Sequence, residues 1–210
     1  MALTGDAYRG LLYRALNPVY ARMPLSGRGA ELYGGRFNPK GTPALYSALD
    51  PVTALREANQ VGSLQPTILV SYRADIAPVF DTREAGQLSA CGMTNEMLAD
   101  PGWRLAMLEG QRVPTQDFAR NLIAEGYAGL LVRSFAKGAG DADLNLVLWK
   151  WGEVGCSLQV VDDEGRLDKM LGSECLENDA EHNDRARFHY DGRVRGKVTG
   201  SDRKPFMPLI

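Results

Sequence analysis

Histidine is almost absent from this 210-residue chain, and its scarcity limits the chemistry that the sequence can support. The two histidines are His182 and His189, so residues 1–171 contain none. A Ser-His-Asp or Cys-His nucleophile is therefore excluded there, and so is a zinc site of the usual His/Cys type. We expect no metal. Chemistry would rely on Glu, Asp, Arg, Tyr, Ser or Lys, which suits reactions that stabilise charge on a substrate with a good leaving group.

Cysteine and long apolar runs are also scarce. The three cysteines, Cys91, Cys156 and Cys175, are widely spaced and odd in number, which argues against a disulfide framework. The N-terminal residues lack the basic segment and apolar run of a signal peptide, and no stretch approaches the roughly 20 apolar residues of a membrane span. We therefore expect reduced cysteines and a cytoplasmic location.

A strong excess of one charge is missing as well. The chain has 24 Lys and Arg residues and 26 Asp and Glu residues, for a formal net charge of -2. This balance gives no basic field for nucleic acid and no polybasic segment for an anionic membrane. We expect neither partner, and we expect any ligand to be recognised locally. The hydrophobic fraction of 44% is sufficient for one substantial core.

Runs rich in β-formers predict several strands, separated by glycine, proline and polar residues. The expected strands are Leu11–Arg14, Ala44–Ser47, Thr67–Arg73, Pro78–Asp81, Gly129–Ser134, Asn145–Trp151 and Ser157–Val161. Trp149 and Trp151 are interpreted as sheet packing. The segment Asn17–Pro43 is dense in glycine and proline, which predicts a long loop.

Helix signals are clearest at two places. Asp50 and Pro51 predict the start of a helix that runs to about Gln60, because an acid can cap the helix and proline suits its first turn. A second helix is expected over Pro114–Glu125, with Gly126 placed to end it. Two short helical segments are expected between residues 94 and 110.

The order of these elements predicts an α+β domain with a mixed or antiparallel sheet rather than regular βαβ alternation. We assign this domain to residues 1–171. Residues 172–210 are polar, with few aliphatic side chains and no clear period, and are expected to form an extension with little core of its own.

The stretch Gly34–Ser47, followed by the helical segment Ala54–Ala58, resembles the RES-domain toxins, which are the toxic half of RES-Xre toxin-antitoxin modules. The family is named after an arginine, a glutamate and a serine. The matching residues here are Arg36, Glu57 and Ser134.

Tyr46 and the upstream Arg14 complete the pattern, which covers roughly residues 9–161. The resemblance implies a split β-core with flanking helices, similar to the diphtheria-toxin-like ADP-ribosyltransferases. It also implies that NAD+ is the substrate, cleaved at its nicotinamide glycosidic bond, with ADP-ribose passed to water, phosphate or a protein. The implied partner is an Xre-type antitoxin.

These residue types suit that chemistry. The planar fork of arginine matches phosphate oxygens, so Arg14 and Arg36 would bind the pyrophosphate. Tyr46 would stack on nicotinamide or ribose, and Ser134 would bond a ribose hydroxyl or the carboxamide. Glu57 would stabilise positive charge that develops on the sugar. Arg36, Tyr46 and Glu57 are thus the expected catalytic residues, and Arg14, Arg36, Tyr46 and Ser134 the expected NAD-binding residues.

Each residue also has a plain structural interpretation. The arginines could form surface ion pairs, Tyr46 could be a core residue, and Ser134 could satisfy a turn. On a helical wheel, Val52, Leu55 and Ala58 mark the expected buried stripe, and Glu57 falls off its centre. A catalytically silent module that binds a nucleotide or a protein is the alternative function.

Overall fold

The structure is a computed structural model that describes residues 5–59 and 65–167. The first of its two units contains the described residues up to Val161, and the next described residues, 162–167, belong to the second unit. The predicted polar extension, residues 172–210, lies outside the described residues. The elements below all belong to the first unit.

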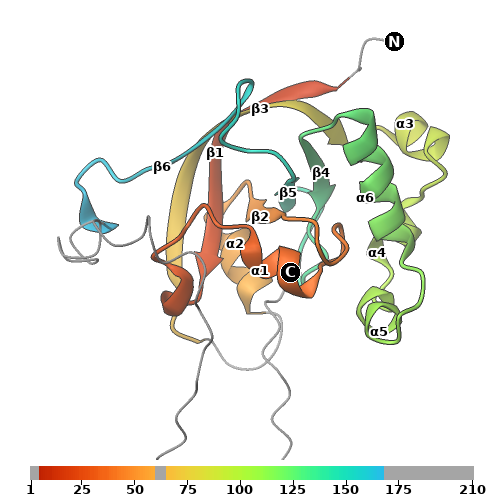
Figure 1. Cartoon of the computed structure of the whole chain (residues 1–210), viewed down its shortest axis with the longest axis horizontal. Coiled ribbons are helices and arrows are strands. Elements are labelled where there is room, and N and C mark those ends of the chain that lie inside the picture. The colour runs from red at the N-terminus through yellow and green to blue at the C-terminus, as the bar shows by residue number, and fades with distance from the viewer. Residues whose placement is uncertain (1–4, 60–64, 168–210) are drawn as a thin grey trace, which may run out of the picture. The chain divides into compact units, whose positions relative to one another are not determined.

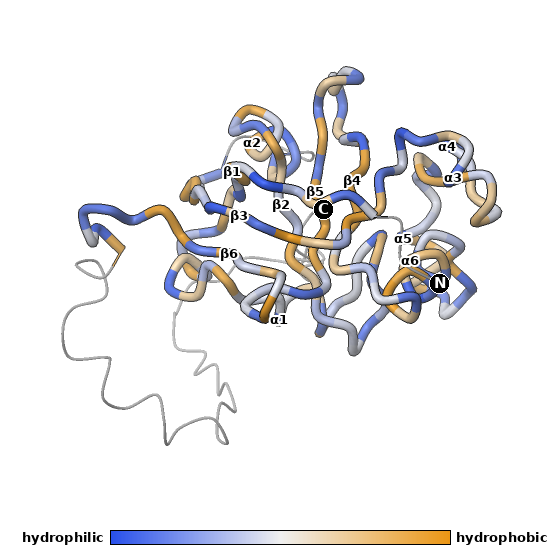
Figure 2. The backbone as a smooth tube through the Cα atoms, turned by 90° about the horizontal axis from the view of Figure 1, so that it is seen from above, coloured by the Kyte–Doolittle hydropathy of each residue, from blue (hydrophilic) through white to orange (hydrophobic). Residues whose placement is uncertain are grey.

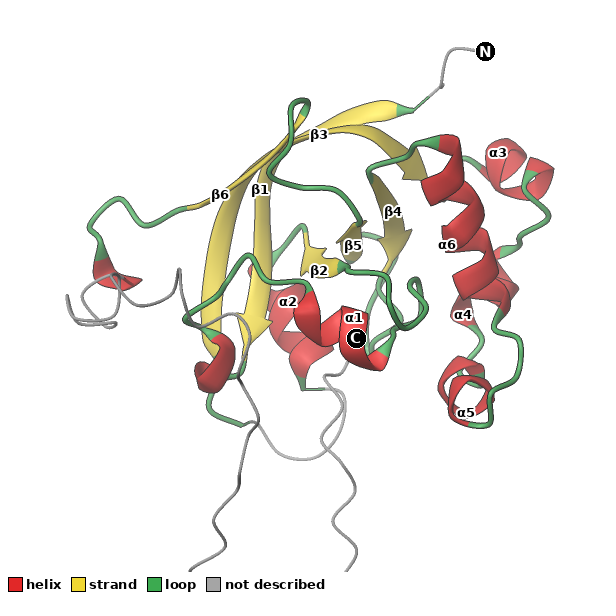
Figure 3. Ribbon diagram, viewed as in Figure 1, coloured by secondary structure: helices red, strands yellow, loops and turns green. Residues whose placement is uncertain are grey.

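The described chain forms one six-stranded sheet (Figures 1 and 3). Its strands are β1 (Asp6–Leu16), β2 (Leu45–Ala48), β3 (Ile68–Asp81), β4 (Gly129–Arg133), β5 (Leu144–Leu148) and β6 (Cys156–Val160). Their order is β1-β2-β5-β4-β3-β6, and β1 also pairs with β3, so the first five strands close into a ring. Strands β3 and β4 run parallel, and the other pairings are antiparallel. This mixed sheet confirms the predicted α+β class.

The helices lie in two groups. The described helical segments are η1 (Pro18–Tyr20), α1 (Arg28–Tyr33), α2 (Pro51–Ala58), α3 (Ala85–Ala90), α4 (Asn95–Ala99), α5 (Trp103–Leu108) and α6 (Pro114–Glu125). Helices α3 to α6 gather on one side of the sheet, next to β4, whereas α2 packs beside β1 and β2 (Figures 1 and 2). Within the described ranges, no helix combines the length and the apolar character needed to cross a membrane.

Strands β4 and β5 are buried on both faces, because successive side chains of a strand point to opposite sides. Leu130 and Val132 join an apolar cluster that α6 covers, whereas Leu131 joins a second cluster shared with β1 and β3. Helix α6 contributes Phe118, whose ring centroid is 5.5 Å from that of Phe80 in an edge-on arrangement. Orange stretches of the tube in Figure 2 mark these apolar segments.

Several predicted elements are confirmed. The helix expected over Pro114–Glu125 has these bounds, and Gly126 ends it with a φ of 100°, in the left-handed region that favours glycine. Helix α2 begins where Asp50 and Pro51 predict. The two short helices expected between residues 94 and 110 are α4 and α5.

The strands at the start of the chain are longer than predicted. The expected strand Leu11–Arg14 is the middle of β1, and the two strands expected at Thr67–Arg73 and Pro78–Asp81 are one continuous strand, β3. The reason is partner pairing, because β1 pairs along nearly all of β3 while β6 pairs with Tyr72–Ile76 on its other edge. Hydrogen bonds on both edges hold a stretch extended that its own sequence does not mark as a strand.

The segment Asn17–Pro43 is not a continuous loop, because it contains η1 and α1. The side chain of Asn17 accepts a hydrogen bond from the backbone N–H of Val19 at 3.0 Å, which caps η1. Helix α3 was also not among the expected elements.

The strand expected over Asn145–Trp151 is shorter than predicted, because β5 ends before both tryptophans. Trp149 donates its indole N–H to the carbonyl of Phe37 at 3.0 Å, and Trp151 donates to the carbonyl of Leu25 at 2.9 Å. The two side chains thus hold the long N-terminal segment against the sheet instead of extending the strand.

We predict that Leu146→Ala lowers the free energy of unfolding by about 2–5 kcal/mol, because Leu146 is fully buried in β5 and its truncation leaves a cavity. Urea denaturation measures the loss. The matched control is Leu105→Ala on α5, where the leucine is 61% exposed and the change should stay within about 0.5 kcal/mol. Equal effects of the two substitutions would contradict this assignment of the core.

Candidate active site

Helix α2 presents a polar face to the sheet. The Asp50 carboxylate caps it by accepting hydrogen bonds from the backbone N–H groups of Val52 and Thr53 at 2.8 and 3.2 Å. The buried residues of the helix are Thr53, Ala54 and Glu57, whereas Val52 is 57% exposed. The predicted buried stripe of Val52, Leu55 and Ala58 was therefore wrong. A helical wheel ranks residues by hydrophobicity, but this face is buried because its polar groups find partners.

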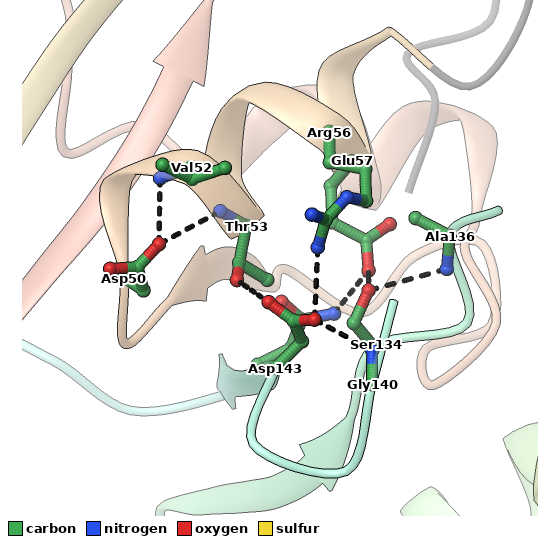
Figure 4. A network of polar contacts seen from close by, with 10 residues as sticks. Asp50, Val52, Thr53, Arg56, Glu57, Ser134, Ala136, Gly140 and Asp143 are labelled. Atoms are coloured by element: carbon green, nitrogen blue, oxygen red, sulfur yellow. Dashed lines mark hydrogen bonds and ion pairs between the residues drawn. The ribbon is translucent and has the colours of Figure 1, made fainter. Parts of the chain in front are cut away.

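Glu57 is 3% exposed, and its carboxylate is held by two side chains of the sheet region. Ser134 donates its hydroxyl to Oε1 of Glu57 at 2.5 Å, and Asn145 donates its amide N–H to the same oxygen at 2.5 Å. The hydroxyl oxygen of Ser134 accepts in turn from the backbone N–H of Ala136 at 3.2 Å (Figure 4). Such charge-assisted hydrogen bonds offset the cost of burying a carboxylate.

A second carboxylate, Asp143, ties α2 to the loop that follows β4 (Figure 4). It accepts a hydrogen bond from the Thr53 hydroxyl at 2.5 Å, pairs with the guanidinium of Arg56 at 2.9 Å, and accepts from the backbone N–H of Gly140 at 2.7 Å. The bond from Thr53, followed by those from Gly140 and Arg56, lowers the pKa of Asp143 below its ordinary value. The backbone carbonyl of Asp143 also accepts from the N–H of Ser134 at 2.7 Å.

Tyr46 is buried on β2 and organises the loop that carries Arg36. Its hydroxyl donates to Oδ1 of Asn38 at 2.7 Å and accepts from the backbone N–H of Phe37 at 3.0 Å. Burial raises the pKa of Tyr46 well above its ordinary value, so the phenol is protonated at neutral pH. In this state the hydroxyl has a structural role, and the ring belongs to the apolar cluster under α6.

Arg36 is held by the last turn of α4 and by the residue that follows it. Its Nη1 donates to the carbonyls of Leu98 and Asp100, each at 2.8 Å, and its guanidinium carbon lies 4.6 Å from the ring centroid of Phe135 and 5.4 Å from that of Trp103. Burial lowers the pKa of Arg36 to about 10, and the nearby negative charge of the Glu57 carboxylate opposes this shift. Arg36 therefore remains a cation at neutral pH, electrostatically coupled to the buried carboxylate.

Arg14 reaches from β1 to the N-terminal segment. Its Nη1 donates to the carbonyls of Pro24 and Ser26 at 3.3 and 3.2 Å, and the hydroxyl of Tyr72 donates to the same Pro24 carbonyl at 2.8 Å. Burial lowers the pKa of Arg14. The alternative interpretation of Arg14 and Arg36 was a surface ion pair. Within the described residues, neither side chain forms one.

A small pocket, whose empty volume of about 180 Å³ includes open solvent, brings several of these side chains together. Its lining residues are Tyr13, Arg14, Ala15, Tyr46, Ser47, Ala48, Ala54, Glu57 and Asn145. Of the five site residues expected from the sequence, Arg14, Tyr46 and Glu57 line the pocket. Ser134 and Arg36 are not among the lining residues, although Ser134 donates a hydrogen bond to the carboxylate of Glu57.

Two site residues were missed by the sequence analysis, namely Asn145 and Asp143. Asn145 had a detectable signal, because it is an amide within the otherwise apolar strand Leu144–Leu148, all of which is buried. Asp143 sits in a small polar loop and carries no signal of its own. In the part of the chain that the structure describes, no group of three or more His, Cys, Asp and Glu side chains is placed to hold a metal ion.

The site combines a buried carboxylate with nearby guanidinium groups. A fixed carboxylate stabilises positive charge that develops close to it, and a guanidinium binds anionic oxygens. The arrangement therefore suits a substrate with an anionic part and a reacting centre that becomes positive.

We predict that Gly35→Ala destabilises the protein by about 1–3 kcal/mol, because the added methyl group has no room. Its Cβ would lie 2.4 Å from the Tyr46 hydroxyl and 2.6 Å from Oδ1 of Asn38, and so would break the bond between them. Gly86→Ala on α3 is the matched control, since a Cβ there meets nothing within 4 Å and should leave stability unchanged or slightly raised. Urea unfolding compares the two variants, and an undisturbed Gly35→Ala would contradict this packing.

We predict that the contribution of Asp143 to stability depends on pH. Because its pKa is lowered in the folded protein, this contribution is complete above the unfolded value of about 3.9 and is lost as the pH falls toward the folded value. The gap in Tm between the parent and Asp143→Asn should thus be constant at neutral pH and shrink below about pH 4. Asp141→Asn, at a carboxylate with 88% of its side chain exposed, should shift Tm little at any pH. A gap that widens in acid would refute the assignment.

The fold can be compared with known structures. The chain is similar to a chain in the crystal structure of the M. tuberculosis MbcT-MbcA toxin-antitoxin complex, with a TM-score of 0.50 and 22% sequence identity. The alignment covers 74% of this chain and 82% of that chain. The likeness supports the predicted fold, a split β-core with flanking helices similar to that of diphtheria-toxin-like ADP-ribosyltransferases. No curated protein sequence matches the chain.

The sequence itself matches a family model over most of its length. The model describes the RES domain, and the match spans residues 11–169, which includes the buried carboxylate, its two hydrogen-bond donors and the lining of the pocket. Since this match covers well over half of the chain, the protein belongs to the RES domain family.

Proposed function

We propose that the protein is the toxin of a toxin-antitoxin pair and that it cleaves NAD+ at the nicotinamide glycosidic bond. The observation that carries the proposal is the buried carboxylate of Glu57, held by Ser134 and Asn145 at the wall of a pocket that Arg14 and Tyr46 share. Membership of the RES domain family supports the same activity, as the sequence resemblance implied.

In the proposed reaction the bond between the ribose carbon and the nicotinamide nitrogen breaks, and both electrons go to nitrogen. The cationic ring leaves as neutral nicotinamide, and positive charge develops on the sugar. The carboxylate of Glu57 stabilises this charge, which needs no proton transfer and therefore no histidine. An oxygen of the acceptor then bonds to the sugar carbon, and the acceptor's proton passes to solvent.

The two arginines are assigned to the anionic part of the substrate. Arg36 is a cation close enough to the Glu57 carboxylate for the two charges to interact, and two backbone carbonyls that use only its Nη1 fix it in place. Arg14 lines the pocket directly. A guanidinium can donate paired hydrogen bonds to phosphate oxygens, so these two side chains suit the pyrophosphate of NAD+.

The acceptor of ADP-ribose is water, phosphate or a protein in this proposal. The partner is an Xre-type antitoxin, a proposal supported by the fold likeness to a chain of a toxin-antitoxin complex. The antitoxin would block access to the pocket, and the toxin would act in the cytoplasm, where NAD+ is available.

We predict that Glu57→Gln lowers kcat for nicotinamide release by about 10²–10³-fold, because it removes the preorganised charge at the reacting centre. The assay uses purified protein with NAD+, with and without phosphate and cell extract as acceptors. Glu153→Gln, at an exposed turn before β6, is the matched control and should keep the parent rate.

Acceptor dependence then separates the chemical outcomes. Release in buffer alone indicates hydrolysis, stimulation by phosphate indicates phosphorolysis, and labelling of a discrete protein indicates ADP-ribosylation. Binding of NAD+ by the parent without release under any condition would favour the silent-module alternative and reject the proposal.

A further inference from the structure

Asn145 occupies an unusual position in the sheet. It lies in β5 between two leucines, opposite Ala48 of β2 and Val132 of β4, and is 6% exposed. Its amide nitrogen donates to Glu57, but its amide oxygen is buried without a hydrogen-bond partner among the residues that the structure describes. A buried acceptor without a donor costs free energy, so the position asks for an explanation.

The orientation of the amide follows from chemistry. A carboxylate only accepts hydrogen bonds, so the nitrogen of Asn145 must face Glu57, because the reverse orientation would place two acceptors in contact. The amide oxygen therefore points away from the Glu57 oxygen that the nitrogen contacts. Asn145 and Glu57 line the same pocket, so a ligand that enters it lies next to both residues.

The two acceptors restrict what the ligand can present. A carboxylate or the fully ionised pyrophosphate of a dinucleotide has no donor to offer at neutral pH, whereas a hydroxyl donates readily. Glu57 and Asn145 are joined by one hydrogen bond and so form a contiguous pair of acceptors. Two hydroxyls on neighbouring carbons match such a pair, with one hydroxyl for each residue.

We infer that Asn145 is a substrate-contacting residue, whose amide oxygen accepts a hydrogen bond from one hydroxyl of a ribose cis-diol while Glu57 takes the other. This inference rests on the proposed function, because it identifies the sugar as the nicotinamide ribose. Glu57 serves the 2'-hydroxyl and Asn145 the 3'-hydroxyl. Asn145 thereby acts twice, since its nitrogen also fixes the carboxylate.

The test compares NAD+ with an analogue that lacks the 3'-hydroxyl of the nicotinamide ribose. Parent protein should lose about tenfold in kcat/KM when this hydroxyl is removed, because the buried oxygen again has no donor. Asn145→Ala should be slower than the parent on NAD+ yet show no further loss on the analogue. Losses that multiply, or a parent indifferent to the hydroxyl, would overturn the inference.

Further measurements separate contact from general damage. Thr82→Val removes another buried hydrogen bond of the sheet region, from Thr82 to the carbonyl of Leu131, at a residue that does not line the pocket, and should leave discrimination between the two substrates unchanged. Calorimetry with ADP-ribose, which keeps the diol, should show weaker binding to Asn145→Ala than to the parent. If Asn145→Ala does not fold, the comparison of the two substrates with the parent protein decides the question by itself.

The outcomes distinguish this inference from the proposed function. Nicotinamide release by the parent without dependence on the 3'-hydroxyl overturns the role of Asn145 and leaves NAD+ cleavage intact. Loss of activity only with an altered nicotinamide carboxamide would assign the amide oxygen to that group instead, and so would also overturn the diol contact. No release by the parent overturns both.

Discussion

A buried carboxylate on a two-turn helix constrains the rest of the site. Glu57 is nearly inaccessible, and a charge in that position is tolerated only when hydrogen-bond donors surround it. The donors come from the end of β4 and from β5, so α2 has to pack where Ser134 and Asn145 can reach it. Asp143 reinforces this docking through Thr53. The orientation of α2 is thus determined by polar contacts, which explains why its apolar Val52 faces outward.

The sheet supplies the rigidity that these contacts need. Strands β4 and β5 belong to the ring of strands and are covered on both faces, so Ser134 and Asn145 project from a well-packed part of the fold. The loops around the pocket are fixed by hydrogen bonds to the same framework, including those from Tyr46 to the Arg36 loop and from Trp149 to Phe37. Polar groups held in fixed positions favour electrostatic stabilisation of a transition state.

Local signals in the sequence predicted local features well. A proline at the start and a glycine at the end define α6, and the acid of the cap defines the start of α2. Such signals act over three or four residues and need no partner elsewhere in the chain. The continuity of β3 could not be predicted from such local signals, because it depends on the pairing of β1 and β6 along its two edges.

For the same reason, the sequence did not predict those features of the site that depend on contacts between distant segments. Glu57 is 77 residues from Ser134 and 88 from Asn145, and no pattern within α2 reports that a serine and an amide will meet its carboxylate. The motif resemblance supplied Glu57, Ser134 and Arg36, although the helical wheel argued for a different buried face. Asn145 was visible only as a polar interruption of an apolar strand, and Asp143 was not visible at all.

The residues on which the family resemblance rests both stabilise the fold and contribute to the site. Arg14 and Tyr46 hold neighbouring segments through backbone and side-chain hydrogen bonds, yet both also line the pocket. Arg36 uses only Nη1 to donate to two backbone carbonyls, and a guanidinium carries five N–H donors in all. The bonds that fix these side chains therefore do not compete with a ligand for all of their donors. Because the same groups build the pocket and face it, a substitution at any of them changes structure and chemistry together, whereas the amide oxygen of Asn145 has no structural partner in the described chain to lose.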